Sequence, residues 1–226
     1  MIKKLILTVL AAITIAATAM AENKEERKVS GKFTAVEVQK GANVSLVQGD
    51  KVGLEIVTDG CPTSDVEASV ANGVLTVKMK KRTPGSAVQV FVYFKDIDKV
   101  TVRRGASVET DGTFTHSGKF TLDIGAKCEA KMDIDVEELD VDASTCMILL
   151  EGKATKQNVV VVGTVGSSTY DAKDLESDDV TIKAVNSDAI VKFNNKLKAD
   201  ALACTVRYIG DSNKVTKSGT GDIHEY

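Results

Sequence analysis

A tract of five mostly small residues recurs through the second half of the chain and limits its fold more than any other feature. The tracts are RGASV (104–108), AKCEA (126–130), ASTCM (143–147), GSSTY (166–170), NSDAI (186–190), LACTV (202–206) and GTGDI (219–223). Most of them end on an apolar residue. A period of about 20 residues with strands and no helices is typical of a parallel β-solenoid, whose coils stack and whose corners hold small residues.

Between the tracts, apolar and polar residues alternate, which is the two-residue period of β-strands. The same alternation begins at Phe33, in FTAVEVQKGANVSLVQGD, and continues in NGVLTVKMKK. The sequence therefore predicts an all-β chain with stacked parallel coils over residues 100–226 and longer strands over residues 30–100. An antiparallel sandwich is the alternative, but tight two-residue hairpin signals are few in the second half.

The stretch MDIDVEELDVDAS (132–144) indicates how one coil leads into the next. The doubled Glu137-Glu138 adds one residue, which turns a corner and resets the alternation. If Leu139 is aligned with Leu122, like residues stack in the two coils. The residues expected to point inward are Leu122, Ile124, Ala126, Cys128, Ala130, Met132, Ile134 and Val136 in one coil, and Leu139, Val141, Ala143, Thr145, Met147 and Leu149 in the next.

Residues 1–21 have the features of a signal peptide. A basic start at Lys3 and Lys4 precedes an apolar run over residues 5–20, and Ala19-Met20-Ala21 fits a signal peptidase site. The run is short and rich in Ala and Thr, which disfavours a membrane span. We expect residues 1–21 to be removed and residues 22–226 to form one domain that is periplasmic, exposed on the cell surface or secreted.

Several of these segments together resemble the family described as putative auto-transporter adhesin, head GIN domain. The resemblance rests on FTAVEVQKGANVSLVQGD, on NGVLTVKMKK, on tracts such as GASV, GSSTYDAKDL and SGTGDI, and on the closing VRYIGDSNKVTKSGTGD. The chain departs from the family at Ser212, where proline is common. The resemblance implies a right-handed parallel β-helix at the cell envelope, and the family supplies no established catalytic residues.

The sequence indicates no catalytic site, cofactor or strong metal site. Carboxylates alternate along two expected strands, and Asp133, Asp135, Asp140 and Asp142 are weak candidates for a divalent cation. Calcium requires six to eight oxygens held by shaped loops, so we expect a solvated acidic face instead. His116 and His224 are the only histidines, and neither belongs to a metal-binding or hydrolase motif.

The expected function is a non-catalytic structural or binding module with an adhesin-like role, whose partner is a glycan or an envelope protein. Scattered Lys and Arg residues and a net charge of −3 exclude the basic face that nucleic acid would require. The alternative is a carbohydrate-active enzyme, a polysaccharide lyase or a glycosidase. A groove with three or more converging ionisable groups would favour the enzyme, whereas a flat surface would favour binding.

The four cysteines are expected to remain unpaired, although two disulfides would be usual in an exported chain. Cys128 and Cys204 both occupy the third position of their tracts, in one inward column with Thr145, Ser168 and Asp188. Four coils separate the two cysteines, about 19 Å at about 4.8 Å per coil, too far for a disulfide. Cys146 should point the opposite way from Cys128, unless the register slips by one residue.

Overall fold

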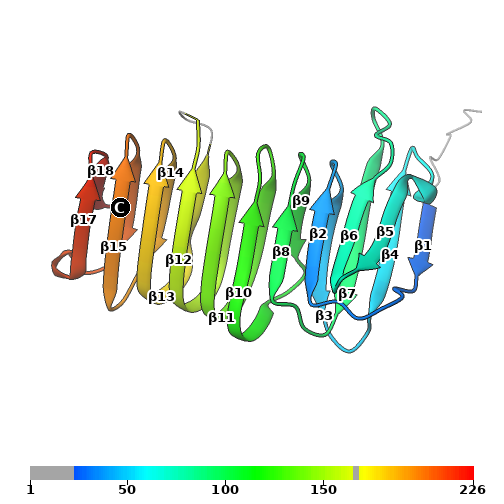
Figure 1. Cartoon of the computed structure of the whole chain (residues 1–226), viewed down its shortest axis with the longest axis horizontal. Coiled ribbons are helices and arrows are strands. Elements are labelled where there is room, and N and C mark those ends of the chain that lie inside the picture. The colour runs from blue at the N-terminus through cyan, green and yellow to red at the C-terminus, as the bar shows by residue number, and fades with distance from the viewer. Residues whose placement is uncertain (1–22, 165–167) are drawn as a thin grey trace, which may run out of the picture.

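The computed structural model describes residues 23–164 and 168–226, which form β-strands and two short 3₁₀ turns without an α-helix (Figure 1). The expected leader and its cleavage site lie outside the described residues, as do the first two residues of the tract at 166–170. The chain forms a β-solenoid of about seven turns with a curled mixed sheet at its N-terminal end. The all-β prediction is confirmed. Among the described residues, no helix is long and apolar enough to cross a bilayer.

Each coil contributes strands to two opposite faces. Face A comprises β1 (Asn23–Arg27), β4 (Gly53–Asp59), β7 (Ala87–Phe94), β3 (Asn43–Gln48), β9 (Ser107–Thr110), the first halves of β11 (Glu129–Ser144), β12 (Met147–Val162) and β13 (Thr169–Val185), and then β14 (Asp188–Lys192), β16 (Thr205–Ile209) and β18 (Asp222–Glu225). Face B comprises β5 (Val66–Ala71), β6 (Val74–Met79), β2 (Ala35–Gln39), β8 (Lys99–Val102), most of β10 (Phe114–Ile124), the second halves of β11 to β13, β15 (Lys196–Leu202) and β17 (Val215–Gly219). The 3₁₀ turns are η1 (Thr63–Asp65) and η2 (Ser212–Lys214).

Consecutive coils pair in parallel, which confirms the solenoid and excludes the antiparallel sandwich for residues 100–226. On face B, Val141 lies beside Val159, Val159 beside Ile182, and Ile182 beside Ala199. The number of residues between two paired positions varies from coil to coil. It stays close to the spacing of the tracts, which predicts coils of roughly 20 residues. All four are buried, so each coil extends one continuous apolar core.

The N-terminal strands differ from the expectation. They contain 4 to 8 residues, whereas β10 to β13 contain 11 to 17. The prediction of longer strands over residues 30–100 is therefore wrong. In β11 to β13 one strand continues from face A around a corner to face B, whereas in the N-terminal part each face has its own strand. There, β4 pairs antiparallel with both β1 and β7, and β5 pairs antiparallel with β6.

The corner at Glu137-Glu138 is confirmed, because Val136 before it and Leu139 after it are both buried. The predicted alignment of Leu139 with Leu122 is wrong. Leu139 lies beside Phe120 and Val141 beside Leu122, so the pairing differs by two residues from the alignment that the tracts suggested.

Residues in the left-handed conformation mark the other corners. They have φ values between 50° and 60° and fall within the tracts at Arg104, Lys127, Thr145, Asn186 and Ala203. Such a residue interrupts the alternation, so the side chains that follow it change sides. Met147, which follows Thr145, consequently faces solvent instead of the core, and Leu149 is only half-buried. Ala126, directly before Lys127, is also exposed at its corner. The tracts are corners, as predicted, but their internal register is not constant.

This change of register corrects the cysteine column. Met147 N donates to Cys128 O, so Cys146 lies directly over Cys128. Thr169 N donates to Cys146 O, which places Ser168 over Cys146 in the next coil. In the predicted column, Cys146 takes the position expected for Thr145, and Ser187 takes the position expected for Asp188. Ser168 is in the column, as predicted. The column contains Ala106, Cys128, Cys146, Ser168, Ser187 and Cys204. Cys128 and Cys146 are buried, and Cys204 is half-buried.

All four cysteines are free thiols, so we expect that a reducing agent leaves the melting temperature unchanged. Burial raises the pKa of the Cys146 thiol to about 11, which keeps it protonated and slow to react. Thermal denaturation with and without dithiothreitol tests this prediction, and non-reducing peptide mapping should recover four unmodified cysteines. A native link between Cys128 and Cys146 would contradict it.

An arginine closes the N-terminal end of the solenoid. The Arg27 guanidinium donates to Thr63 O at 2.9 Å, to Val66 O at 2.7 Å and to the Glu25 carboxylate at 2.6 Å. These bonds connect β1 on face A with the η1 turn and the start of β5 on face B. The hydrogen bond from Arg27 lowers the pKa of Glu25 to about 2. A fixed cation therefore bridges the two faces at this end.

Candidate functional site

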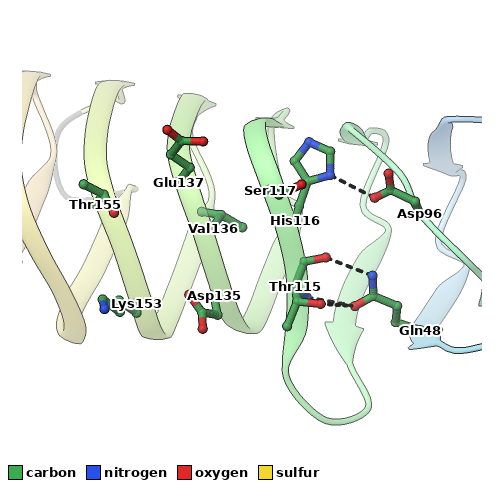
Figure 2. A pocket seen from close by; sticks show the side chains of 10 residues that line it. All are labelled: Gln48, Asp96, Thr115, His116, Ser117, Asp135, Val136, Glu137, Lys153 and Thr155. Atoms are coloured by element: carbon green, nitrogen blue, oxygen red, sulfur yellow. Dashed lines mark hydrogen bonds and ion pairs between the residues drawn. The ribbon is translucent and has the colours of Figure 1, made fainter.

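An open groove of about 560 Å³ is lined by four successive coils where the strands pass from face A to face B (Figure 2). We call it the corner groove. It is lined by Gln48, Asp96, Thr115, His116, Ser117, Asp135, Val136, Glu137, Lys153 and Thr155. These residues come from the end of β3, the loop after β7, and β10, β11 and β12. The lining is mostly polar, and five of its residues are ionisable.

The strand geometry explains why polar residues meet here. In β11, Val136 points into the core while its neighbours Asp135 and Glu137 point outward. Lys153 and Thr155 occupy equivalent outward positions in β12, since Asp135 lies beside Lys153. Polar residues two apart in each strand therefore form rows across neighbouring coils.

His116 is the most constrained ionisable residue of the corner groove. Its Nδ1 lies 2.8 Å from Asp96 Oδ1, and its ring lies parallel to the ring of Phe114 with 6.3 Å between centroids. Gly118 lies beside the other ring nitrogen, Nε2. A side chain at position 118 would crowd this nitrogen, because its Cβ would lie 3.3 Å away. The His116 side chain is 14% exposed. The imidazole is therefore held in one orientation by a carboxylate and an aromatic ring.

Gln48 fixes the same edge of the groove as Asp96, because it binds Thr115, the neighbour of His116. Its Oε1 accepts hydrogen bonds from Thr115 N at 2.8 Å and from Thr115 Oγ1 at 3.2 Å, and its Nε2 donates to Thr115 O (Figure 2). Nε2 also donates to Lys95 O at 3.1 Å. A single amide thus connects the end of β3 with the start of β10. The wall of the groove formed by Thr115 and His116 is held by side-chain hydrogen bonds as well as by the sheet.

Comparison with known proteins identifies the family. The model described as "Putative auto-transporter adhesin, head GIN domain" matches residues 32–212. The chain belongs to this family. The resemblance seen in the sequence is therefore confirmed, and a family of auto-transporter adhesins suggests an exported protein. No curated protein matches the chain.

Solved structures show the same fold. A putative adhesin from Bacteroides fragilis NCTC 9343 has a TM-score of 0.76 and 14% identity, with 91% of this chain and 97% of that chain covered. A putative lipid binding protein from Parabacteroides distasonis ATCC 8503 has a TM-score of 0.67 and 17% identity, covering 91% and 96%. A putative adhesin from the same organism has a TM-score of 0.66 and 18% identity, covering 92% and 98%. At these identities the likeness concerns the fold alone.

The four aspartates considered as metal ligands do not form one site in this head GIN domain. Asp133 and Asp135 lie on face A, and Asp140 and Asp142 lie on face B. Asp133 accepts a hydrogen bond from Thr113 Oγ1 at 2.7 Å, and Asp140 pairs with Lys119. Among residues 23–164 and 168–226, no group of three or more His, Cys, Asp and Glu residues has a metal-binding arrangement. Of the four, only Asp135 lines the corner groove.

The two histidines differ in their surroundings. His224 lies on β18 at the C-terminal end of the solenoid, where its Nδ1 is 3.1 Å from Asp222. His116, by contrast, lies in the corner groove of this head GIN domain beside Asp96, a residue that sequence analysis did not single out. A usable signal was present, because Asp96 precedes His116 by the length of one coil. Residues one coil apart in the same phase are neighbours in a solenoid.

Proposed function

We propose that this protein is an exported, non-catalytic binding module of the cell envelope that holds an extended polymer, such as a glycan, in the corner groove. The observation that supports this proposal is the row of hydrogen-bonding side chains that crosses three successive coils. A polymer with repeated hydroxyl or carboxyl groups would meet donors and acceptors at the spacing of the coils, about 4.8 Å. The groove is open, so a long chain could enter from either side.

The chemistry of the lining also favours a polar ligand over a lipid tail. One of the ten lining residues is aliphatic, Val136, and its side chain points into the core. An acyl chain would gain little apolar contact there and would cover charged groups, whose desolvation is unfavourable. The lipid binding named for the Parabacteroides distasonis neighbour therefore has no counterpart in the corner groove.

A carbohydrate-active enzyme is the second candidate, because five ionisable residues line one groove. These are Asp96, His116, Asp135, Glu137 and Lys153. A histidine oriented by a carboxylate is a common arrangement in acid–base catalysis. Within the described residues, however, no ion pair connects Asp135, Glu137 or Lys153 with the His116–Asp96 pair. The binding function therefore remains our proposal.

A glycan array probed with residues 22–226, followed by titration of the best polysaccharide, tests the proposal. Replacing both Asp135 and Lys153 with alanine is expected to weaken binding by at least about tenfold, because hydrogen bonds to charged groups contribute about 1.5–3 kcal/mol each. The matched control removes Asp142 and Lys183, which are equally exposed on face B, and should bind like the parent protein.

The same polysaccharides, incubated with the protein and analysed for new reducing or unsaturated ends, separate the two candidate functions. Unchanged polymer length is expected. Release of fragments that is lost in the Asp135/Lys153 double variant would support the enzyme instead. Failure of every array glycan to bind would contradict the glycan assignment.

A further inference from the structure

The C-terminal end of the solenoid exposes the edges of two strands. In the described part of the chain, β17 forms a strand ladder only with β15, and β18 forms one only with β16 (Figure 1). Almost all of their residues are half-buried or exposed. An open edge of this kind presents unpaired N–H and C=O groups to which another strand can add. Some feature must act against such pairing if the protein is to avoid it.

Lys217 occupies an unusual position at this end. The pairing of β17 with β15 places it beside Ala199, which is fully buried in the core. Lys217 therefore occupies a core-facing position of its coil. In the preceding coil, the core-facing positions of β15 are occupied by leucine and alanine. Its side chain points across the end of the core instead of outward from face B.

The contacts of the Lys217 ammonium join the two last strands. Nζ donates to Ile223 O on β18 at 2.6 Å and lies 5.3 Å from the centre of the Tyr208 ring. The hydrogen bond occupies an acceptor of the β18 strand, and the cation–π contact places the charge over the last aromatic residue of the core. Lys217 thus bridges face B and face A at the C-terminal end, as Arg27 does at the N-terminal end.

This charge opposes the addition of a further coil. A strand that stacked on β17 would remove the ammonium from water, and the effective penalty for burying an ion is several kcal/mol. A second copy approaching with the same end would face a further obstacle. A two-fold axis would bring the two Lys217 side chains together, and like charges repel.

We propose that Lys217 is a gatekeeper that prevents the C-terminal end of one molecule from pairing with the same end of a second copy. Without the charge, the two β17 edges can join antiparallel about a two-fold axis. Because a two-fold contact uses the same surface on both molecules, it closes at a dimer and does not extend to a fibre.

Lys217→Val tests the proposal in sedimentation equilibrium of residues 22–226. The expected result is twice the mass of the parent protein, together with slower amide exchange over residues 215–219. Lys217→Arg keeps the charge and should retain the parent mass. Lys198→Val removes a lysine that points outward from β15 and should also leave the mass unchanged.

Circular dichroism checks that each variant is folded, and Lys217→Met, which keeps the aliphatic length of lysine over Tyr208, replaces the valine variant if valine disrupts the end. The proposal is overturned if the folded neutral variants keep the parent mass. Association of the Lys198→Val control to the same extent, or fibres instead of dimers, would equally reject it.

Discussion

Replacing Gly152 with alanine is expected to destabilise the protein by roughly 2 to 5 kcal/mol. Gly152 lies within β12 beside Ile134 of the previous coil and has a φ of +102°. A Cβ at this position would lie 2.2 Å from Ile134 O and 3.0 Å from Ile134 N. Alanine would therefore combine an unfavourable backbone conformation with a collision against the backbone of a neighbouring coil. Urea denaturation followed by circular dichroism measures the loss.

Gly112 provides the matched control for this prediction. It has a φ of +85°, but a Cβ would meet no atom within 4 Å. Gly112→Ala should therefore show only the conformational part of the penalty, roughly 1 to 2 kcal/mol. If the two variants lose the same stability, close packing between coils is not what requires glycine at position 152.

Replacing Tyr170 with alanine should destabilise the protein by about 3 to 5 kcal/mol, as truncation of large buried aromatic residues does. Tyr170 is fully buried, and its hydroxyl donates to Gln157 Oε1 at 2.8 Å. Gln157 in turn donates to Ser177 Oγ at 2.5 Å. This chain of hydrogen bonds crosses the core between the two faces. Thermal and urea denaturation of the variant measure the effect.

A milder substitution separates the hydrogen bond from the volume. Tyr170→Phe keeps the ring but leaves Gln157 Oε1 without its donor, so a loss of about 1 to 3 kcal/mol is expected. Adding Gln157→Leu to Tyr170→Phe should cost less than the sum of the two single changes, since the partners are coupled. Tyr226→Phe, at a side chain that is 61% exposed, is the control and should change little. Full stability of Tyr170→Phe would contradict a structural role for this network.

The parallel coils could be predicted because every coil repeats the same chemistry at nearly the same spacing. The register within a coil could not be predicted as reliably. Lys127 and Thr145 adopt the left-handed conformation without being glycine, so the residue type gives no warning that the alternation changes there. The exposed position of Met147 and the stacking of Cys146 over Cys128 both follow from those two corners.

The corner groove was harder to predict than the fold. The outward positions of a solenoid contribute little to its core, so the alternation of apolar and polar residues does not reveal which of them meet. Asp96 and His116 also lie in different segments, and only the length of one coil relates them. His116 is isolated in the sequence because its partners come from other coils. The structure brings it together with Asp96 and places Asp135 in the same groove.

The five left-handed corner residues also affect whether a single coil can be stable without its neighbours. A left-handed conformation costs most L-residues with a side chain about 1 to 2 kcal/mol, so Arg104, Lys127, Thr145 and Ala203 together store roughly 4 to 8 kcal/mol of conformational strain, whereas Asn186 tolerates this conformation better. That sum is similar to the whole net stability of an ordinary domain, about 5 to 15 kcal/mol. A single coil has no neighbour to compensate its strained corner. The turns are therefore stable only as a stack, and the corners make folding of the solenoid collective.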